Sequence, residues 1–148
     1  MVGAMTETTA ERPLAAAETP IELILARQVA SYLTLPILLT DAAGDTFFYN
    51  ESAEQLLGRR FDEAGPLPLP ERAEALAFRD ESGTPVPFDE LPLVRALRLG
   101  RPDNRRLTMR GLDGVDRPIE ATAFPLTRSD GTLVGGVAIF WERASPSP

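Results

Sequence analysis

The chain has 148 residues, of which 43% are hydrophobic and 25% charged, a composition typical of one globular domain. It has no cysteine and no histidine, which excludes disulfides, thiolate or imidazole metal sites and catalysis by an imidazole base. Its fifteen basic residues are all arginine and its net charge is −7, which excludes Schiff-base chemistry and argues against a nucleic-acid-binding surface. No apolar run approaches the ~20 residues that span a bilayer and no signal peptide is apparent, so we expect a cytoplasmic protein without membrane contact.

The first predicted element is an amphipathic helix. Residues 1–18 are rich in Ala, Thr and Glu, which indicates a disordered lead. Thr19-Pro20-Ile21-Glu22 has the spacing of a capping box, so we expect residues 19–34 to form a helical segment with Thr19 as N-cap and Pro20 as the first helical residue. One face of this helix is apolar and carries Ile21, Leu25, Val29 and Tyr32.

A β-hairpin and a second helix follow. Residues 37–41 and 46–50 are short, largely apolar runs on either side of a turn that contains Gly44, which predicts two antiparallel strands. Asn50 is a good N-cap for a helix over residues 51–57. Gly58 supplies the left-handed residue that commonly ends such a helix.

The middle of the chain predicts irregular structure and two more helices. Residues 61–70 contain three prolines within a few positions, which excludes a helix interior or a central strand. A short helix is expected over residues 71–76. A longer one is expected over residues 90–99, with Asp89 as its N-cap and Pro92 in its first turn.

The last third predicts three antiparallel strands over residues 105–110, 117–126 and 132–142. The turns between them fall at Asp113-Gly114 and Asp130-Gly131. The first of these strands and the residues before it carry a group of arginines, a pattern typical of an edge strand protected by charge, which consists of Arg101, Arg105, Arg106 and Arg110. Residues 144–148 are predicted to be a disordered tail.

The order and spacing of these elements resemble a Per-Arnt-Sim (PAS) domain over residues 33–142. The residues that carry the resemblance are Asp41, Gly44, Asn50, Ala53, Gly58, Gly83, Asp89, Glu90, Leu91, Pro92, Asp113, Gly114, Asp130, Gly131 and Gly135. The resemblance implies an α+β fold, with a five-stranded antiparallel sheet and short helices on one face of it over residues 35–143. The N-terminal helix would cap this domain. A pocket, where PAS domains have one, lies between the sheet and the short helices.

The resemblance also limits the cofactor. PAS domains that bind haem usually use a histidine, and light-oxygen-voltage flavin domains need a reactive cysteine; this chain has neither residue. A histidine-ligated haem and a cysteine-adduct flavin are therefore excluded. The cofactor stays unassigned, and the remaining expectation is a small, mostly apolar ligand held without a covalent bond.

By the same resemblance, alternate residues of the sheet point at the pocket. Together with residues of the facing helix they give the ligand-binding candidates Leu38, Thr40, Leu93, Val94, Leu97, Ile119, Ala121, Ala123, Gly136, Ala138 and Phe140. Four of the sheet positions are Gly or Ala, which leaves volume to be filled. Either a small apolar ligand oriented by Thr40 fills it, or core side chains do, among them Phe61, Phe78 and Phe88.

The opposite face of the sheet is more apolar than a soluble monomer normally exposes. We expect the N-terminal helix and a second subunit to cover it together, as in PAS proteins that resemble this chain. The candidate residues of this homodimer interface are Ile21, Leu25, Val29, Phe124, Leu126, Val137, Ile139 and Trp141. The alternative is a helix that folds back within one subunit, which leaves the chain monomeric.

Together these features predict a signal-sensing and protein-interaction module rather than an enzyme. It would bind a small ligand, form homodimers, or do both, and could contact a signalling-protein partner. One alternative is a ligand-free docking module. Another is a small enzyme on a curved antiparallel sheet, whose candidate acids are Asp41, Asp89 and Glu90. Structural roles explain Asp41 and Asp89 more simply, because carboxylates at turns and helix starts commonly accept backbone N–H groups.

Overall fold

The computed structural model describes residues 19–58 and 69–143. The predicted N-terminal lead, the C-terminal tail and Phe61 lie outside the described residues. The elements in chain order are α2 (Ile21–Tyr32), β1 (Ile37–Asp41), β2 (Thr46–Tyr49), α3 (Glu51–Leu57), α5 (Leu69–Leu76), the 3-10 helix η2 (Phe88–Glu90), α6 (Pro92–Leu99), β3 (Asp103–Arg110), β4 (Asp116–Thr127) and β5 (Leu133–Glu142).

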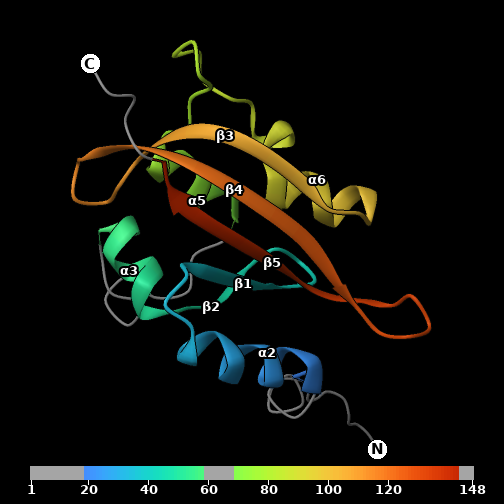
Figure 1. Cartoon of the computed structure of the whole chain (residues 1–148). Helices are drawn as coiled ribbons and strands as arrows, with labels where there is room; N and C mark the ends of the chain where they lie inside the picture. Colours follow the sequence, from blue (N-terminus) through green and yellow to red (C-terminus); the bar gives the residue numbers. More distant parts are fainter. Residues whose placement is uncertain (1–18, 59–68, 144–148) are drawn as a thin grey trace, which may run out of the picture.

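The five strands form one antiparallel sheet in the order β2-β1-β5-β4-β3. The helices α5 and α6 lie behind the sheet in Figure 1, and α2 packs near β1 and β5 on the other side. This arrangement confirms the predicted α+β fold. It also places the arginine-rich strand β3 at an edge, as its charge pattern predicts.

Asn50 joins three segments at one end of the sheet. Its side chain is 2% exposed, and Oδ1 accepts the N–H of Ala53 at 3.0 Å, which confirms Asn50 as the N-cap of α3. The same oxygen accepts the N–H of Ile37, the first residue of β1, at 3.1 Å. The amide nitrogen donates to the carbonyls of Ala30 and Leu35, each at 2.9 Å. One side chain therefore ties the end of α2 to the starts of β1 and α3.

Two predicted helix N-caps are wrong. Pro20, not Thr19, is the N-cap of α2, with no side-chain cap, because Pro20 is extended (ψ 139°) and the helix begins one residue later. Residues 90–99 do not form one helix capped by Asp89: η2 ends at Glu90, Leu91 is extended, and α6 begins at Pro92. For α6 the physical reason is that Leu91, the residue before proline, is disfavoured in the helical region, whereas Pro92 suits the first helical position.

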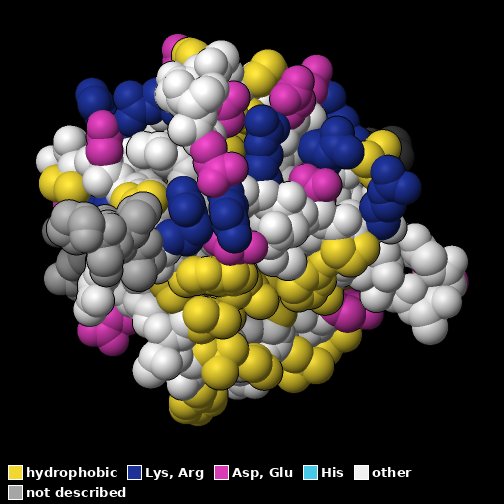
Figure 2. Space-filling view, turned by 45° about the horizontal axis from the view of Figure 1, so that its top comes forward, with side chains coloured by type: hydrophobic (Ala, Val, Ile, Leu, Met, Phe, Trp, Pro, Cys, Tyr) yellow, Lys and Arg dark blue, Asp and Glu magenta, His cyan; other side chains and the backbone are white. Residues whose placement is uncertain are grey.

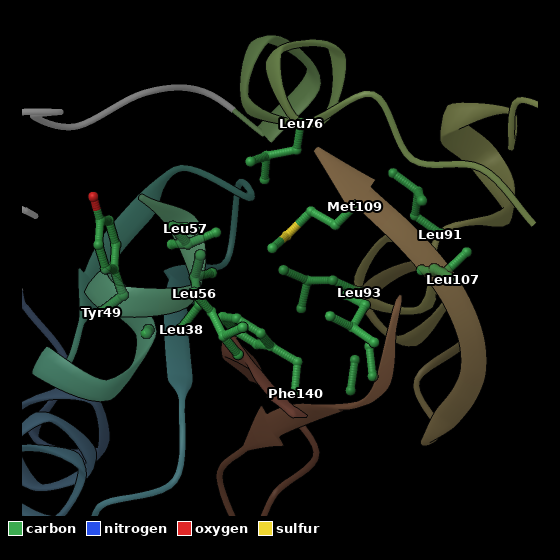
Figure 3. Close-up of a cluster of buried hydrophobic side chains, with 14 of the residues drawn as sticks. Leu38, Tyr49, Leu56, Leu57, Leu76, Leu91, Leu93, Leu107, Met109 and Phe140 are labelled. Carbon is green, nitrogen blue, oxygen red and sulfur yellow. The ribbon is translucent and has the colours of Figure 1, made fainter. Parts of the chain in front are cut away.

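The sheet separates two hydrophobic cores. The first lies between the sheet and α3, α5 and α6, and Figure 3 shows Leu57, Leu76 and Met109 converging there from three different elements. The second lies between the sheet and α2, where Ala30 packs with Ile37, Leu39 and Val137. The predicted alternation of β4 and β5 is confirmed, because their two sets of apolar residues divide between these cores.

Candidate functional site

The first core contains a cavity of about 80 Å³ between the sheet and the helices α5 and α6. Every side chain that lines it is hydrophobic: Leu38, Leu57, Ala73, Leu76, Phe78, Leu91, Pro92, Leu93, Val94, Leu107, Met109, Ile119, Ala121, Ala138 and Phe140. A water molecule there would find none of the two to four polar partners it needs. The cavity therefore suits apolar atoms.

Most of the predicted pocket residues line this cavity. They are Leu38, Leu93, Val94, Ile119, Ala121, Ala138 and Phe140. The others, Thr40, Leu97, Ala123 and Gly136, do not line it. Gly136 and Thr40 are paired neighbours on β5 and β1, one step along the strands from the Ala138–Leu38 pair.

Sequence reasoning missed several lining residues. Leu107 and Met109 alternate along β3 and are each 1% exposed, so the rule of alternation applied to this strand would have found them. Leu57 is the last residue of α3. The neighbouring leucines Leu56 and Leu57 indicate burial but not which of the two faces the cavity. Leu76 is the last residue of α5, and the proline-rich sequence before that helix gave no signal of its direction. Phe78, expected as a core residue filling this volume, does line the cavity.

Thr40 is a buried polar residue at the margin of this site. It is 0% exposed, and its Oγ1 has no hydrogen-bond partner among the described residues. A Cβ placed on Gly136 would lie 3.1 Å from Thr40 Oγ1, 2.9 Å from Leu93 Cδ1 and 3.0 Å from Leu97 Cδ2. The tips of two leucines from α6 and the threonine hydroxyl therefore meet above Gly136.

The acids considered for catalysis all have structural partners. Asp41 Oδ1 accepts the backbone N–H groups of Ala43 and Asp45, each at 3.0 Å, which confirms its predicted role in the turn. Asp89 forms an ion pair with Arg98 at 2.7 Å. Glu90 pairs with Arg105 at 3.2 Å. In the described ranges, no group of three His, Cys, Asp or Glu residues could hold a metal ion.

A cluster of two arginines and an aspartate lies at the sheet edge, away from the cavity. Arg110 and Arg79 each approach the Asp116 carboxylate to 2.9 Å. Hydrogen bonds from Arg110 and then Arg79 lower the pKa of Asp116 from 3.8 to about 2. These groups tie β3 and β4 to the segment before η2, and none of them lines the cavity.

The helix α2 presents most of its large apolar side chains to solvent. Leu23 (1% exposed) and Ala30 (2%) face the sheet, whereas Ile21, Leu25, Val29 and Tyr32 are 60%, 54%, 58% and 87% exposed. The two charged residues of α2 turn toward their own subunit: Glu22 pairs with Arg128 at 3.5 Å, and the Arg27 guanidinium lies 4.7 Å from the centre of the Phe48 ring. The exposed apolar face is therefore free of charge.

Of the other predicted interface residues, Val137 is buried and four are half-buried on the same side of the sheet as α2, namely Phe124, Leu126, Ile139 and Trp141. Figure 2 shows hydrophobic side chains gathered on one face, below a band of arginine and acidic side chains. Within one subunit, α2 therefore covers part of this face of the sheet. The outward side of α2 is itself an exposed apolar surface.

No protein-family model and no curated protein matches the sequence. Solved structures do match, and they are PAS domains. The PAS domain of a protein from Colwellia psychrerythraea is 20% identical with a TM-score of 0.59, and the match covers 82% of this chain and 96% of that one. For the PAS domain of BvgS from Bordetella pertussis the identity is 18% and the TM-score 0.62, with 85% and 89% covered.

The LOV protein of Rhodobacter sphaeroides matches with a TM-score of 0.66 at 13% identity, over 84% of this chain and 69% of that one. At such low sequence identities the likeness establishes the fold. It assigns neither a ligand nor a partner to this chain. In the described part of the chain, no helix is long and apolar enough to cross a membrane.

Proposed function

We propose that this chain, which has the fold of a PAS domain, is a non-catalytic sensing module. It binds a small apolar ligand without a covalent bond in the cavity of the first core, and it associates with a second copy through α2. The observation that carries the proposal is the cavity of about 80 Å³ with a wholly apolar lining. Protein interiors are normally close-packed, so an apolar hollow of this size in the core needs an explanation.

The cost of the empty cavity indicates how strongly a ligand could act. At about 24 cal/mol per Å³ for a closed cavity, a volume of about 80 Å³ sets an upper limit of about 2 kcal/mol of lost stability, because this cavity is partly open. A ligand that fills the cavity recovers part of this free energy. The volume is below the roughly 300–1,000 Å³ of pockets for drug-sized ligands, which favours a ligand of only a few heavy atoms.

Xenon, a small apolar probe, tests the ligand site. We expect saturable xenon binding near Ala121, measured by methyl chemical shifts, and loss of that binding in Ala121→Val, whose added methyl groups enter the cavity. Ala123→Val is the matched control, because Ala123 lies on the same strand and face but does not line the cavity. Wild-type protein that does not respond to xenon would contradict the ligand site.

The outward face of α2 supports the second half of the proposal. A helix that turns Ala30 to its own sheet and Ile, Leu, Val and Tyr side chains to solvent has its larger apolar face without a cover. The absence of charge on that face suits a second copy, since two chains of net charge −7 would meet there without like-charge contacts. A two-fold axis would place identical faces against each other.

Sedimentation measures the association directly. We expect a dimer at micromolar concentration that becomes monomeric in Val29→Glu, because the new carboxylate would be buried against its own copy. Ser31→Glu adds the same charge to the flank of the same helix and should leave the dimer intact. A wild-type chain that stays monomeric at 100-fold higher concentration would refute association through α2.

Asn50 supplies a physical connection between the ligand cavity and α2. Leu57 of α3 lines the cavity, and Asn50 caps α3 while it also binds two carbonyls at and after the end of α2. A ligand can relay a signal along this route only if it binds two arrangements of α2 with different affinity.

A further inference from the structure

The Thr40 hydroxyl needs an explanation that packing alone does not give. It is fully buried, and Oγ1 has no partner among the described residues. Most buried polar groups are paired, because an unpaired one keeps the full cost of its desolvation. Valine has nearly the shape of threonine and would avoid that cost.

The surroundings of the hydroxyl point toward the cavity. Thr40 and Gly136 form a pair of β1 and β5, and the next pair on the same face, Leu38 and Ala138, lines the cavity. Two residues along a strand span about 7 Å, so the hydroxyl lies one such step from the cavity wall. Polar group and apolar cavity are thus neighbours on one surface.

Leucine side chains separate the two. Leu93 lines the cavity on one side. A Cβ placed on Gly136 would lie 2.9 Å from Leu93 Cδ1 and 3.1 Å from Thr40 Oγ1, so the leucine tip and the hydroxyl meet at that point. Leu97, one turn further along α6, reaches the same point from the other side. These contacts are the ends of flexible side chains, not backbone, so a rotamer change of Leu93 would join the hydroxyl to the cavity.

We propose that the cavity and Thr40 form one site for a small uncharged amphiphile, a short apolar body that ends in a hydroxyl or carbonyl oxygen. This inference rests on the ligand site of the proposed function and names the class of its ligand. The apolar body occupies the cavity, Leu93 moves aside, and the polar end pairs with Thr40 Oγ1. A hydroxyl both donates and accepts, so it can pair with an alcohol or with a carbonyl oxygen.

The lining excludes a charged ligand. All the lining residues are hydrophobic, and an ion buried there would find no counter-charge. The small volume excludes a bulky ring system, and the single hydroxyl allows one polar end.

The first test compares the stability of ligand-free wild-type protein and Thr40→Val. Because the substitution removes an unpaired buried hydroxyl and keeps the shape, we expect a higher midpoint of urea unfolding for the variant. A lower midpoint would mean that the hydroxyl is paired within the fold, and would overturn the inference.

The second test uses n-butanol and n-butanethiol, which have similar shapes but differ in the strength of their hydrogen bonds. Binding is followed by the methyl shifts of Ala138 and Leu93. We expect Thr40→Val to weaken n-butanol roughly three- to tenfold, the range of one hydrogen bond, and to leave n-butanethiol unchanged. Comparing wild type with variant for each probe cancels the different costs of removing the two probes from water.

Gly136→Ala provides a second variant that keeps the hydroxyl. Its methyl group would occupy the point where Thr40, Leu93 and Leu97 meet, and we expect it to weaken n-butanol more than xenon. If Thr40→Val and Gly136→Ala bind n-butanol as wild type does while xenon still binds, the role of Thr40 is overturned and the apolar cavity stands. If neither xenon nor n-butanol binds wild-type protein, the proposed function fails, and this inference fails with it.

Discussion

The Asn50 side chain offers the sharpest test of how α2 is attached to the domain. Asn50→Asp keeps the oxygen that accepts the N–H groups of Ile37 and Ala53. It replaces the amide nitrogen, which donates to the carbonyls of Ala30 and Leu35, by a second oxygen. The substitution therefore removes these two donated hydrogen bonds and a longer contact to the Leu33 carbonyl at 3.4 Å, at a site that is 2% exposed, and it preserves the cap of α3.

The size of the effect follows from those two bonds. The Ala30 carbonyl still accepts the N–H of Leu33, so each lost bond counts at its net value of about 0.5–1.5 kcal/mol, and the pair gives about 1–3 kcal/mol of lost stability. A domain of this size is stable by only about 5–15 kcal/mol in total. Since the two carbonyls lie at and after the end of α2, we expect α2 to detach before the sheet unfolds.

Urea unfolding and amide hydrogen exchange together measure this prediction. The unfolding free energy should fall by the stated amount, and exchange in α2 should accelerate more than exchange in β4 and β5. Ser52→Ala is the control, because Ser52 Oγ donates to the Thr34 carbonyl of the same linker at an exposed position, where the loss should stay below about 1 kcal/mol. If Asn50→Asp unfolds at the same urea concentration as Ser52→Ala, the reasoning about Asn50 is refuted.

Three further perturbations test the packing and the charges. Because the folded-state pKa of Asp116 is about 2, against an ordinary 3.8, its contribution to stability is present above pH 3.8 and is lost as the pH falls toward 2. In a plot of the urea midpoint against pH, Asp116→Asn should flatten the curve between pH 2 and pH 3.8, and an unchanged curve would contradict this prediction. Gly135→Ala should lower the thermal midpoint more than Gly136→Ala, since its added Cβ meets the backbone carbonyl of Thr40 as well as Leu23, whereas the Cβ at Gly136 meets side-chain ends; the reverse order would count against the packing described. Leu23→Ala should cost about 2–5 kcal/mol in urea unfolding and Val29→Ala under about 1 kcal/mol in a monomeric background, and equal effects would mean that α2 does not pack on its own sheet through Leu23.

Alternation and turn chemistry predicted most of the fold. The faces of β4 and β5, the cap at Asn50 and the left-handed Gly58 (φ 82°) are local consequences of residue type, and all of them are confirmed. The start of α6 was wrong, although the restriction on Leu91 before Pro92 was visible in the sequence. A proline in the first turn fits a helix only when the residue before it is extended, as Leu91 is.

The orientation of α2 and the extent of the cavity depend on contacts between distant segments. Periodicity identified the larger apolar face of α2, but the sheet takes the face of Leu23 and Ala30, and Gly135 leaves the room that the Leu23 side chain fills, since a Cβ there would lie 2.8 Å from Leu23 Cδ2. Likewise, Leu76 lines the cavity from a short helix that the sequence places only approximately. Whether the candidate residues bind a ligand stays a prediction.

The pairing of β1 with β5 determines how the domain would respond to tension. Ile37 lies opposite Ile139, and the N–H of Phe140 donates to the carbonyl of Pro36, so the chain enters β1 and leaves β5 at the same end of the ladder. Hydrogen bonds of an antiparallel pair run across the strands, and a force that separates these two chain segments loads them one after another. The β1–β5 ladder would therefore unzip at low force, one hydrogen-bonded pair after another, beginning at Ile37 and reaching the Thr40–Gly136 pair near its far end.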